Sequence, residues 1–190
     1  MSHISESAVR PATTAIEPVA QNPGAPTGSG NTVATLVATF FGGGLFPLAP
    51  GTCAAAAAVL FGWIMQSWFG WGPPEFCFLV VVTIGPAVWA SGIVAKDRRT
   101  RDPDMVVVDE VIGQWVALAG VATLDWSTAL LAFLFFRFFD VWKPPPVRQL
   151  EKLRGGFGIV ADDVMAGAYS ALALYLVSQW QIVLSPATGQ

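Results

Sequence analysis

Residues 76–95 read FCFLVVVTIGPAVWASGIVA, an unbroken apolar stretch with no charged side chain. The hydrocarbon core of a bilayer is about 30 Å thick and needs about 20 helical residues to cross it, so this stretch predicts a transmembrane helix. Residues 159–180 are long enough to predict a second one. Residues 54–69 and 129–142 are marginal in length, and residues 111–124 are short enough to form a tilted, half-inserted or re-entrant helix.

The composition agrees with a membrane protein. Hydrophobic residues make up 54% of the chain and charged residues 12%, against about 25% charged residues in soluble domains. The predicted fold class is therefore all-α, a polytopic membrane helical bundle with four to five transmembrane or re-entrant helices. Residues 1–31 are polar and are predicted to be a disordered tail that is not a signal peptide, and residues 32–190 to be a single membrane-embedded domain.

Several kinds of chemistry are excluded by composition. The net charge is −3, without a polybasic stripe, so nucleic acid is not an expected partner. The only histidine, His3, lies in the predicted tail, which removes histidine bases and ligands. Cys53 and Cys77 lie in apolar runs without metal-ligand spacing and are expected to act as small apolar residues. Acid–base chemistry must therefore depend on carboxylates.

Basic residues predict the orientation in the membrane. They concentrate in two loops, which the positive-inside rule assigns to the cytoplasm: Lys96, Arg98, Arg99 and Arg101 in one, and Lys143, Arg148, Lys152 and Arg154 in the other. If the apolar segments alternate in direction, the acidic motifs and residues 50–52 lie at the same cytoplasmic face.

Acidic residues next to apolar helices are costly and usually mark function. They form three groups in this sequence: Asp109 with Glu110, Asp140 alone, and Asp162 with Asp163. The alternative interpretation of each pair is helix capping, but Asp140 lies near the end of a predicted helix, where the macrodipole opposes a carboxylate. We expect all five acids to be catalytic and metal-binding.

Charge balance favours a divalent metal at this site. The five acids carry −5, and the nearby Arg137 and Lys143 reduce this to −3, before a phosphomonoester adds about −1.5 to −2. All-oxygen ligands suit Mg²⁺ or Mn²⁺.

A phosphate-binding role is predicted for basic and small residues near the acids. Arg137 lies three residues before Asp140 on the same helical face and could hold phosphate or form an intrahelical ion pair. Lys143 is expected to neutralise phosphate. Gly155 and Gly156 could offer backbone N–H groups at a helix N-terminus. Thr52 could either cap a helix or bind phosphate.

Four stretches together resemble the phosphatidylglycerophosphatase A family. They are residues 41–52, 108–115 (VDEVIGQW), 136–144 (FRFFDVWKP) and 155–167 (GGFGIVADDVMAG). The resemblance extends over residues 33–178, with the motifs in the family's order and spacing, and the last two stretches are highly specific.

This resemblance implies a Mg²⁺-dependent phosphatase of the bacterial inner membrane. It removes the terminal phosphate of phosphatidylglycerophosphate to give phosphatidylglycerol, and its active site faces the cytoplasm. The five acids fall at acidic positions of the family, and Arg137 and Lys143 fall at basic ones. The sequence leaves open whether a carboxylate or a metal-activated water attacks phosphorus, with water favoured, and it gives no oligomeric state.

Rival interpretations depend on other features. A small transporter or channel with an acidic ion path is the alternative from a different class. A CDP-alcohol phosphotransferase would need a spaced Asp-Gly and Ala-Arg pattern that is missing. Asp102 begins a segment, DPDMV, that superficially fits the haloacid-dehalogenase phosphatase motif, but a charged run precedes it instead of a buried strand, so it is expected to be a solvated loop.

Overall fold

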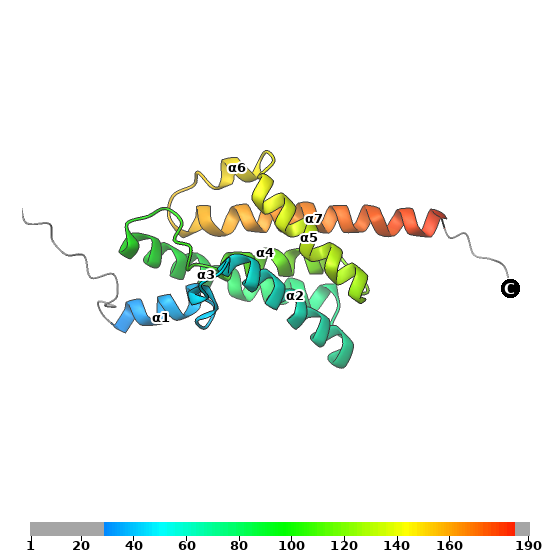
Figure 1. Cartoon of the computed structure of the whole chain (residues 1–190), viewed down its shortest axis with the longest axis horizontal. Coiled ribbons are helices and arrows are strands. Elements are labelled where there is room, and N and C mark those ends of the chain that lie inside the picture. Colours follow the sequence, from blue (N-terminus) through cyan, green and yellow to red (C-terminus); the bar gives the residue numbers. More distant parts are fainter. Residues whose placement is uncertain (1–28, 185–190) are drawn as a thin grey trace, which may run out of the picture.

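The computed structural model describes residues 29–184 as an all-helical bundle (Figure 1), which confirms the predicted fold class. The predicted disordered tail lies outside these residues, except that its last three residues belong to the first helix. No strand occurs within the described range. The elements are α1 (Ser29–Ala38), the 3₁₀ helix η1 (Gly43–Leu45), α2 (Pro50–Phe69), α3 (Pro73–Arg98), α4 (Val108–Ala119), α5 (Trp126–Trp142), α6 (Val147–Leu150) and α7 (Gly156–Leu184).

Three of these helices are long and apolar enough to cross a membrane, namely α2, α3 and α7. Large apolar side chains such as Trp68, Phe78 and Val81 are exposed on them, as lipid-facing side chains are. The expected count of four or five crossings is not confirmed. Helix α5 has 17 residues and α4 only 12, so α4 is about 18 Å long and shorter than the hydrocarbon core.

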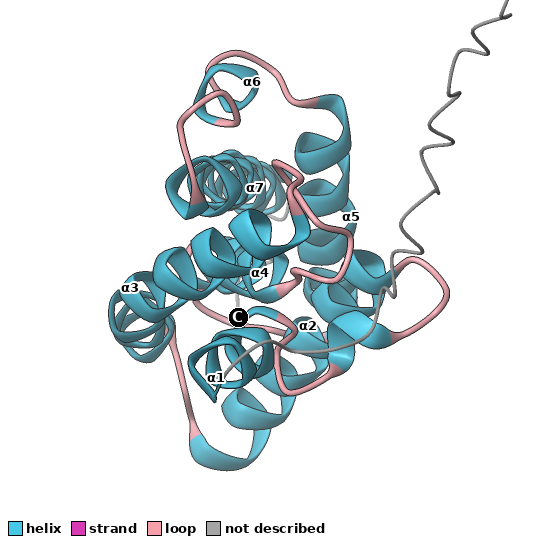
Figure 2. Cartoon of the chain, turned by 90° about the vertical axis from the view of Figure 1, so that its left-hand side faces the viewer, coloured by secondary structure: helices cyan, strands magenta, loops and turns pink. Residues whose placement is uncertain are grey.

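Helix α4 lies at the centre of the bundle, where Figure 2 shows it surrounded by the other helices. It contacts α1, α2, α3, α5 and α7. Its buried side chains include Val111, Ile112 and Leu118, none more than 1% exposed. Because protein surrounds this short helix, its polar residues are shielded from lipid by neighbouring helices.

Helices α4 and α7 cross closely because their contact is built from glycines. A Cβ atom at Gly113 would lie 2.6 Å from the carbonyl oxygen of Asp163 and would also overlap Phe136. A Cβ atom at Gly167 would overlap the carbonyl oxygen of Gly113. Asp109 precedes Gly113 by one helical turn, and Asp163 precedes Gly167 by one turn. The crossing therefore places these two acids side by side.

The turn between α4 and α5 lies near the far end of α2. The side chain of Gln66 donates a hydrogen bond to the carbonyl oxygen of Ala122 at 3.2 Å and accepts one from the amide of Leu124. The start of α4 and the end of α5 consequently lie at the opposite end of the bundle, where α2 and α7 begin. This alternation is the one expected from the apolar segments.

Candidate active site

Asp109 and Glu110 occupy the first turn of α4 but do not cap it. The N-cap residue is Val107, and no side chain makes a capping hydrogen bond there. A true capping acid in this chain is Asp125, whose carboxylate accepts from the amide of Thr128 at 2.7 Å. The capping interpretation of the first acidic pair is therefore wrong.

The second acidic pair also lies inside a helix. Helix α7 begins at Gly156, so Asp162 and Asp163 come almost two turns later, and the capping interpretation of this pair is wrong as well. Only Gly155, with φ of +66°, precedes the helix. A Cβ atom at Gly156 would overlap the carbonyl oxygen of Val88, so this glycine permits the contact between α3 and α7. Phosphate binding by Gly155 and Gly156 stays a prediction.

Three carboxylates converge where α4 meets α7. Asp109, Glu110 and Asp163 each offer an oxygen atom, and these atoms all lie within 4.8 Å of one another; we call them the acidic triad. Asp109 is 5% exposed and Asp163 is 4% exposed. Within the described chain, Oδ1 of Asp109 and Oε2 of Glu110 are buried and make no hydrogen bond. Buried carboxylates of this kind need a cation or a proton.

Burial and the crowding of carboxylates at the site raise the pKa of the two triad residues on α4, Asp109 and Glu110. Both lie outside the three candidate membrane spans. Burial raises the pKa of Asp109, and the charges of Glu110 and Asp163 raise it further. Burial also raises the pKa of Glu110, although a hydrogen bond with Asp109 opposes this, and the charge of Asp140 adds to the increase. Without a bound cation the site therefore tends to take up protons.

The two other predicted acids are neutralised by basic side chains. Nη1 of Arg137 lies 2.6 Å from Oδ2 of Asp140, the intrahelical ion pair that the alternative interpretation predicts. Nζ of Lys143 lies 2.8 Å from Oδ2 of Asp162 and 3.4 Å from Oε2 of Glu151. Burial alone would lower the pKa of Lys143, but the bonded carboxylate of Asp162 outweighs it and raises that pKa. Both cations thus form ion pairs with acids outside the triad, although Arg137 also acts electrostatically on Glu110.

Asp140 connects the paired acids to the triad. Its carboxylate is close enough to act electrostatically on both Glu110 and Asp163. The structure therefore brings all five predicted acids to one end of the bundle, on α4, α5 and α7. The three without a cationic partner in the described chain are those whose oxygens converge.

The acidic triad fits a hard divalent cation. Its donors are carboxylate oxygens only, and two of their buried atoms lack a partner in the part of the chain described. Mg²⁺ commonly binds one or two carboxylates together with waters and substrate phosphate, and oxygen ligands also suit Mn²⁺. A charge of −3 on the ionised triad would be largely offset by one such ion.

The start of α2 completes the wall beside Glu110. Ala49 is the N-cap residue, with φ of 46°, so the capping interpretation of Thr52 is wrong. Thr52 is half-buried in the first turn, and its role in phosphate binding stays a prediction. The sequence placed Gly51 at the same face as the acids but did not predict its contact with Glu110, whose carboxylate a Cβ atom at Gly51 would overlap. Its position at a helix start next to proline was the available signal.

Two further acids near the site were also missed. Asp102 lies in a loop, as expected, and is exposed overall, but it lines a cavity together with Asp162 and Glu151. Burial of its carboxyl raises the pKa of Asp102, although the charge of Lys143 opposes this. Glu151 reaches the site through its contact with Lys143. The DPDMV pattern at Asp102 gave no sign of its place at the cavity, and no short-range pattern marks Glu151, because both belong to loops whose positions depend on tertiary packing.

Comparisons with known proteins agree on one family. The sequence profile described as phosphatidylglycerophosphatase A matches residues 36–178. A protein of Escherichia coli (strain K12) named phosphatidylglycerophosphatase A is 37% identical over 143 residues, which are 75% of this chain and 81% of that protein. One of the same name from Haemophilus influenzae is 34% identical over 148 residues, 77% of this chain and 90% of that protein.

A third relative carries a different name. The Bacteroides thetaiotaomicron protein named putative phosphatidylinositol-3-phosphatase is 37% identical over 155 residues, 77% of this chain and 94% of that protein. No solved structure matches the chain.

Proposed function

The chain belongs to the phosphatidylglycerophosphatase A family, and from this premise we propose that it hydrolyses the terminal phosphomonoester of phosphatidylglycerophosphate. The products are phosphatidylglycerol and inorganic phosphate, and the reaction belongs to phospholipid biosynthesis. The main observation behind the proposed site is which of the five acids form ion pairs with basic side chains. Basic side chains neutralise Asp140 and Asp162, which leaves the acidic triad for a cation and a phosphate.

We propose that Asp109, Glu110 and Asp163 hold Mg²⁺ or Mn²⁺, with Asp140 and Asp162 beside them. When bound, such an ion neutralises phosphate charge and lowers the pKa of a bound water. Its fit is supported by the convergent oxygens and by the unpartnered buried atoms on Asp109 and Glu110.

The protein's own residues account for charge and proton handling. Arg137 and Lys143 flank the triad and can turn part of their hydrogen-bonding capacity from Asp140 and Asp162 to the transferring phosphoryl group. We assign the proton of an attacking water to an acid of the site that does not hold the ion, either Glu110 or an aspartate, because a carboxylate bound to a cation is a weaker base. The backbone at Gly51 leaves space for the Glu110 carboxylate.

We further propose that this end of the bundle faces the cytoplasm of a bacterial inner membrane. The two basic segments, of which the first begins in the last turn of α3, flank the acidic site, which agrees with the positive-inside rule. A variant without Cys53 and Cys77 but with Asp104→Cys, in an exposed loop position, tests this. A membrane-impermeant thiol reagent should label it only after the cells are opened, and labelling in intact spheroplasts would place the site on the other face.

The decisive assay measures phosphate release by the purified full-length protein in neutral detergent micelles. Phosphatidylglycerophosphate should be hydrolysed with added Mg²⁺ and not in excess EDTA. Phosphatidylinositol 3-phosphate is the comparison substrate suggested by the Bacteroides relative's name, and preferential hydrolysis of it would overturn the assigned substrate. Asp109→Asn should lower kcat at least about a hundredfold, as loss of a transition-state-stabilising group does. Ion flux through vesicles without phosphate release would instead support the transporter alternative.

A further inference from the structure

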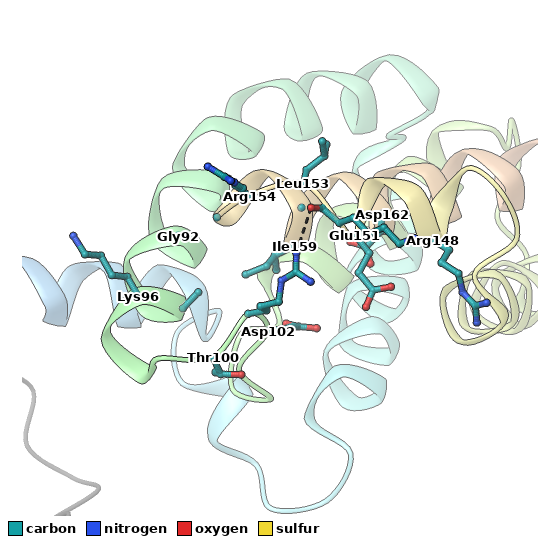
Figure 3. A pocket seen from close by; sticks show the side chains of 15 residues that line it. Gly92, Lys96, Thr100, Asp102, Arg148, Glu151, Leu153, Arg154, Ile159 and Asp162 are labelled. Atoms are coloured by element: carbon teal, nitrogen blue, oxygen red, sulfur yellow. Dashed lines mark hydrogen bonds between the residues drawn. The ribbon is translucent and has the colours of Figure 1, made fainter.

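A cavity of about 560 Å³ adjoins the acidic site, between the end of α3, the loop that follows it and the start of α7 (Figure 3). Its size falls within the range of about 300–1,000 Å³ typical of small-molecule sites. Gly92, Ala95 and Ile159 form an apolar part of its wall, whereas Asp102, Glu151 and Asp162 belong to its acidic part. The close contact of Gly92 with Gly156 brings α3 and α7 together at this wall.

Positive charge dominates the lining of the cavity. Five basic residues line it: Lys96, Arg101, Arg148, Lys152 and Arg154. In the part of the chain that the structure describes, none of these five forms an ion pair. Glu151 and Asp162 on the same wall are already paired with Lys143, which lies outside the lining. The cavity therefore offers unneutralised cations in a chain whose net charge is −3.

Arg101 is the cation placed to act within the cavity. Its Nη2 atom donates a 3.3 Å hydrogen bond to the carbonyl oxygen of Lys152, so the side chain reaches from the loop after α3 to the segment before α7. In Figure 3 the side chains of Lys96, Arg148 and Arg154 extend away from the middle of the cavity. A guanidinium has five N–H donors, and one bond to a carbonyl leaves most of them for an anion.

The cavity and the acidic triad are neighbours. Asp162 lines the cavity and is followed directly by Asp163 of the triad. Asp102, also in the lining, acts electrostatically on Asp109 of the triad. A ligand that fills the cavity can therefore extend into the acidic site.

We propose that this cavity binds the phosphodiester of the lipid substrate through Arg101, while the terminal phosphate lies at the acidic triad. This inference rests on the proposed function. In phosphatidylglycerophosphate a single glycerol joins the two phosphates, so an anion beside the reacting group is the feature that distinguishes this lipid from phosphatidic acid. A monoanionic diester matches an arginine donor fork, and the apolar wall can accept the glycerol and the start of the acyl chains.

Attraction of the basic loops to any anionic bilayer is the competing account of these cations. This account predicts that all exposed basic residues of the loop contribute equally to activity. It also predicts that their contribution disappears in neutral micelles. The proposal predicts that Arg101 acts in neutral micelles and discriminates between substrates. Arg99 is a matched control, since it lies in the same loop, is exposed and does not line the cavity.

The experiment compares Arg101→Gln with Arg99→Gln in neutral detergent, using phosphatidylglycerophosphate and phosphatidic acid as substrates. For Arg101→Gln we expect the KM for phosphatidylglycerophosphate to rise about tenfold, as for the loss of one charge-assisted contact, with a smaller change in kcat. The preference for this lipid over phosphatidic acid should fall by a similar factor. Arg101→Lys should restore part of it. Soluble glycerophosphoglycerol should inhibit the wild-type protein and inhibit Arg101→Gln more weakly, whereas inhibition by inorganic phosphate should differ little.

Other outcomes overturn the proposal. The diester site would be refuted if Arg101→Gln left the KM unchanged or reduced activity equally on both lipids. It would also be refuted if Arg99→Gln had the same effect as Arg101→Gln. An effect seen only in anionic vesicles would show that these cations bind the bilayer instead. If Arg101→Gln does not fold, Arg101→Lys and the inhibition of the wild-type protein by glycerophosphoglycerol still decide. Absence of phosphate release from phosphatidylglycerophosphate by the wild-type protein would instead refute the proposed function.

Discussion

Replacing Asp163 by Asn should stabilise the metal-free protein and weaken its response to Mg²⁺. The triad oxygens lie within 4.8 Å of one another, and two unit charges at that separation repel by about 3.5 kcal/mol at an effective dielectric constant of 20. Protonation of a carboxyl removes part of this repulsion, so the full value is an upper limit. We therefore expect Asp163→Asn to raise the free energy of unfolding in EDTA by about 2 kcal/mol, or about 4–8 °C in Tm.

The assay is thermal unfolding of the purified protein in detergent, in EDTA and in MgCl₂. Mg²⁺ should raise the Tm of the wild-type protein and have a smaller effect on Asp163→Asn, while kcat falls at least about a hundredfold. Asp125→Asn is the matched control, because Asp125 is an exposed cap of α5 and Asn caps equally well. A lower Tm of Asp163→Asn in EDTA, together with equal Mg²⁺ shifts in both proteins, would refute the triad as a cation site.

Three other predictions follow from the packing and chemistry of the site. Gly113→Ala should push α4 away from α7, lower the free energy of unfolding by about 1–3 kcal/mol and reduce kcat. Gly85→Ala is the control, because a Cβ atom there meets open space, and it should change neither Tm nor kcat. Because the pKa of Lys143 is raised above its ordinary 10.5, its bond to Asp162 stabilises the fold fully below the unfolded-state pKa and is lost only as pH rises through the folded-state pKa. The Lys143–Asp162 bond should therefore cause no fall in Tm between pH 7 and pH 10. Over this range the pH dependence of Tm should be the same in the wild-type protein and in Lys143→Gln. Single-turnover hydrolysis in ¹⁸O-water should place the label in released phosphate without a hydroxylamine-sensitive phosphoenzyme, and trapping such an adduct would establish a carboxylate nucleophile instead.

The amino-acid sequence was sufficient for the fold class and the family. Long apolar stretches such as residues 76–95 require helices in a bilayer, because the backbone must satisfy its own hydrogen bonds there. The alternation of these stretches also predicted that Asp109, Asp140 and Asp163 would lie at one end of the bundle, and in the structure they do. These inferences succeed because periodicity, length and charge are local properties of the chain.

Helix boundaries and packing were harder to predict. The last helix was predicted over residues 159–180, yet it already begins at Gly156, where the missing side chain lets α3 approach at Val88. The short α4 is a central buried helix because five other helices cover it. Neither result follows from local propensity, since both depend on which surfaces come into contact.

The roles of most of the five acids were decided by tertiary structure. The ion pair of Arg137 with Asp140 lies within one helix, and the sequence already offered it as an alternative. Tertiary packing alone brings Lys143 to Asp162, and the glycine contact between α4 and α7 makes Asp109, Glu110 and Asp163 converge without an ion pair in the described chain. The same packing brings Arg101 across a cavity to the segment before α7. Electrostatic pairing depends on distances of a few ångströms between residues far apart in the chain, and only the assembled bundle determines those distances.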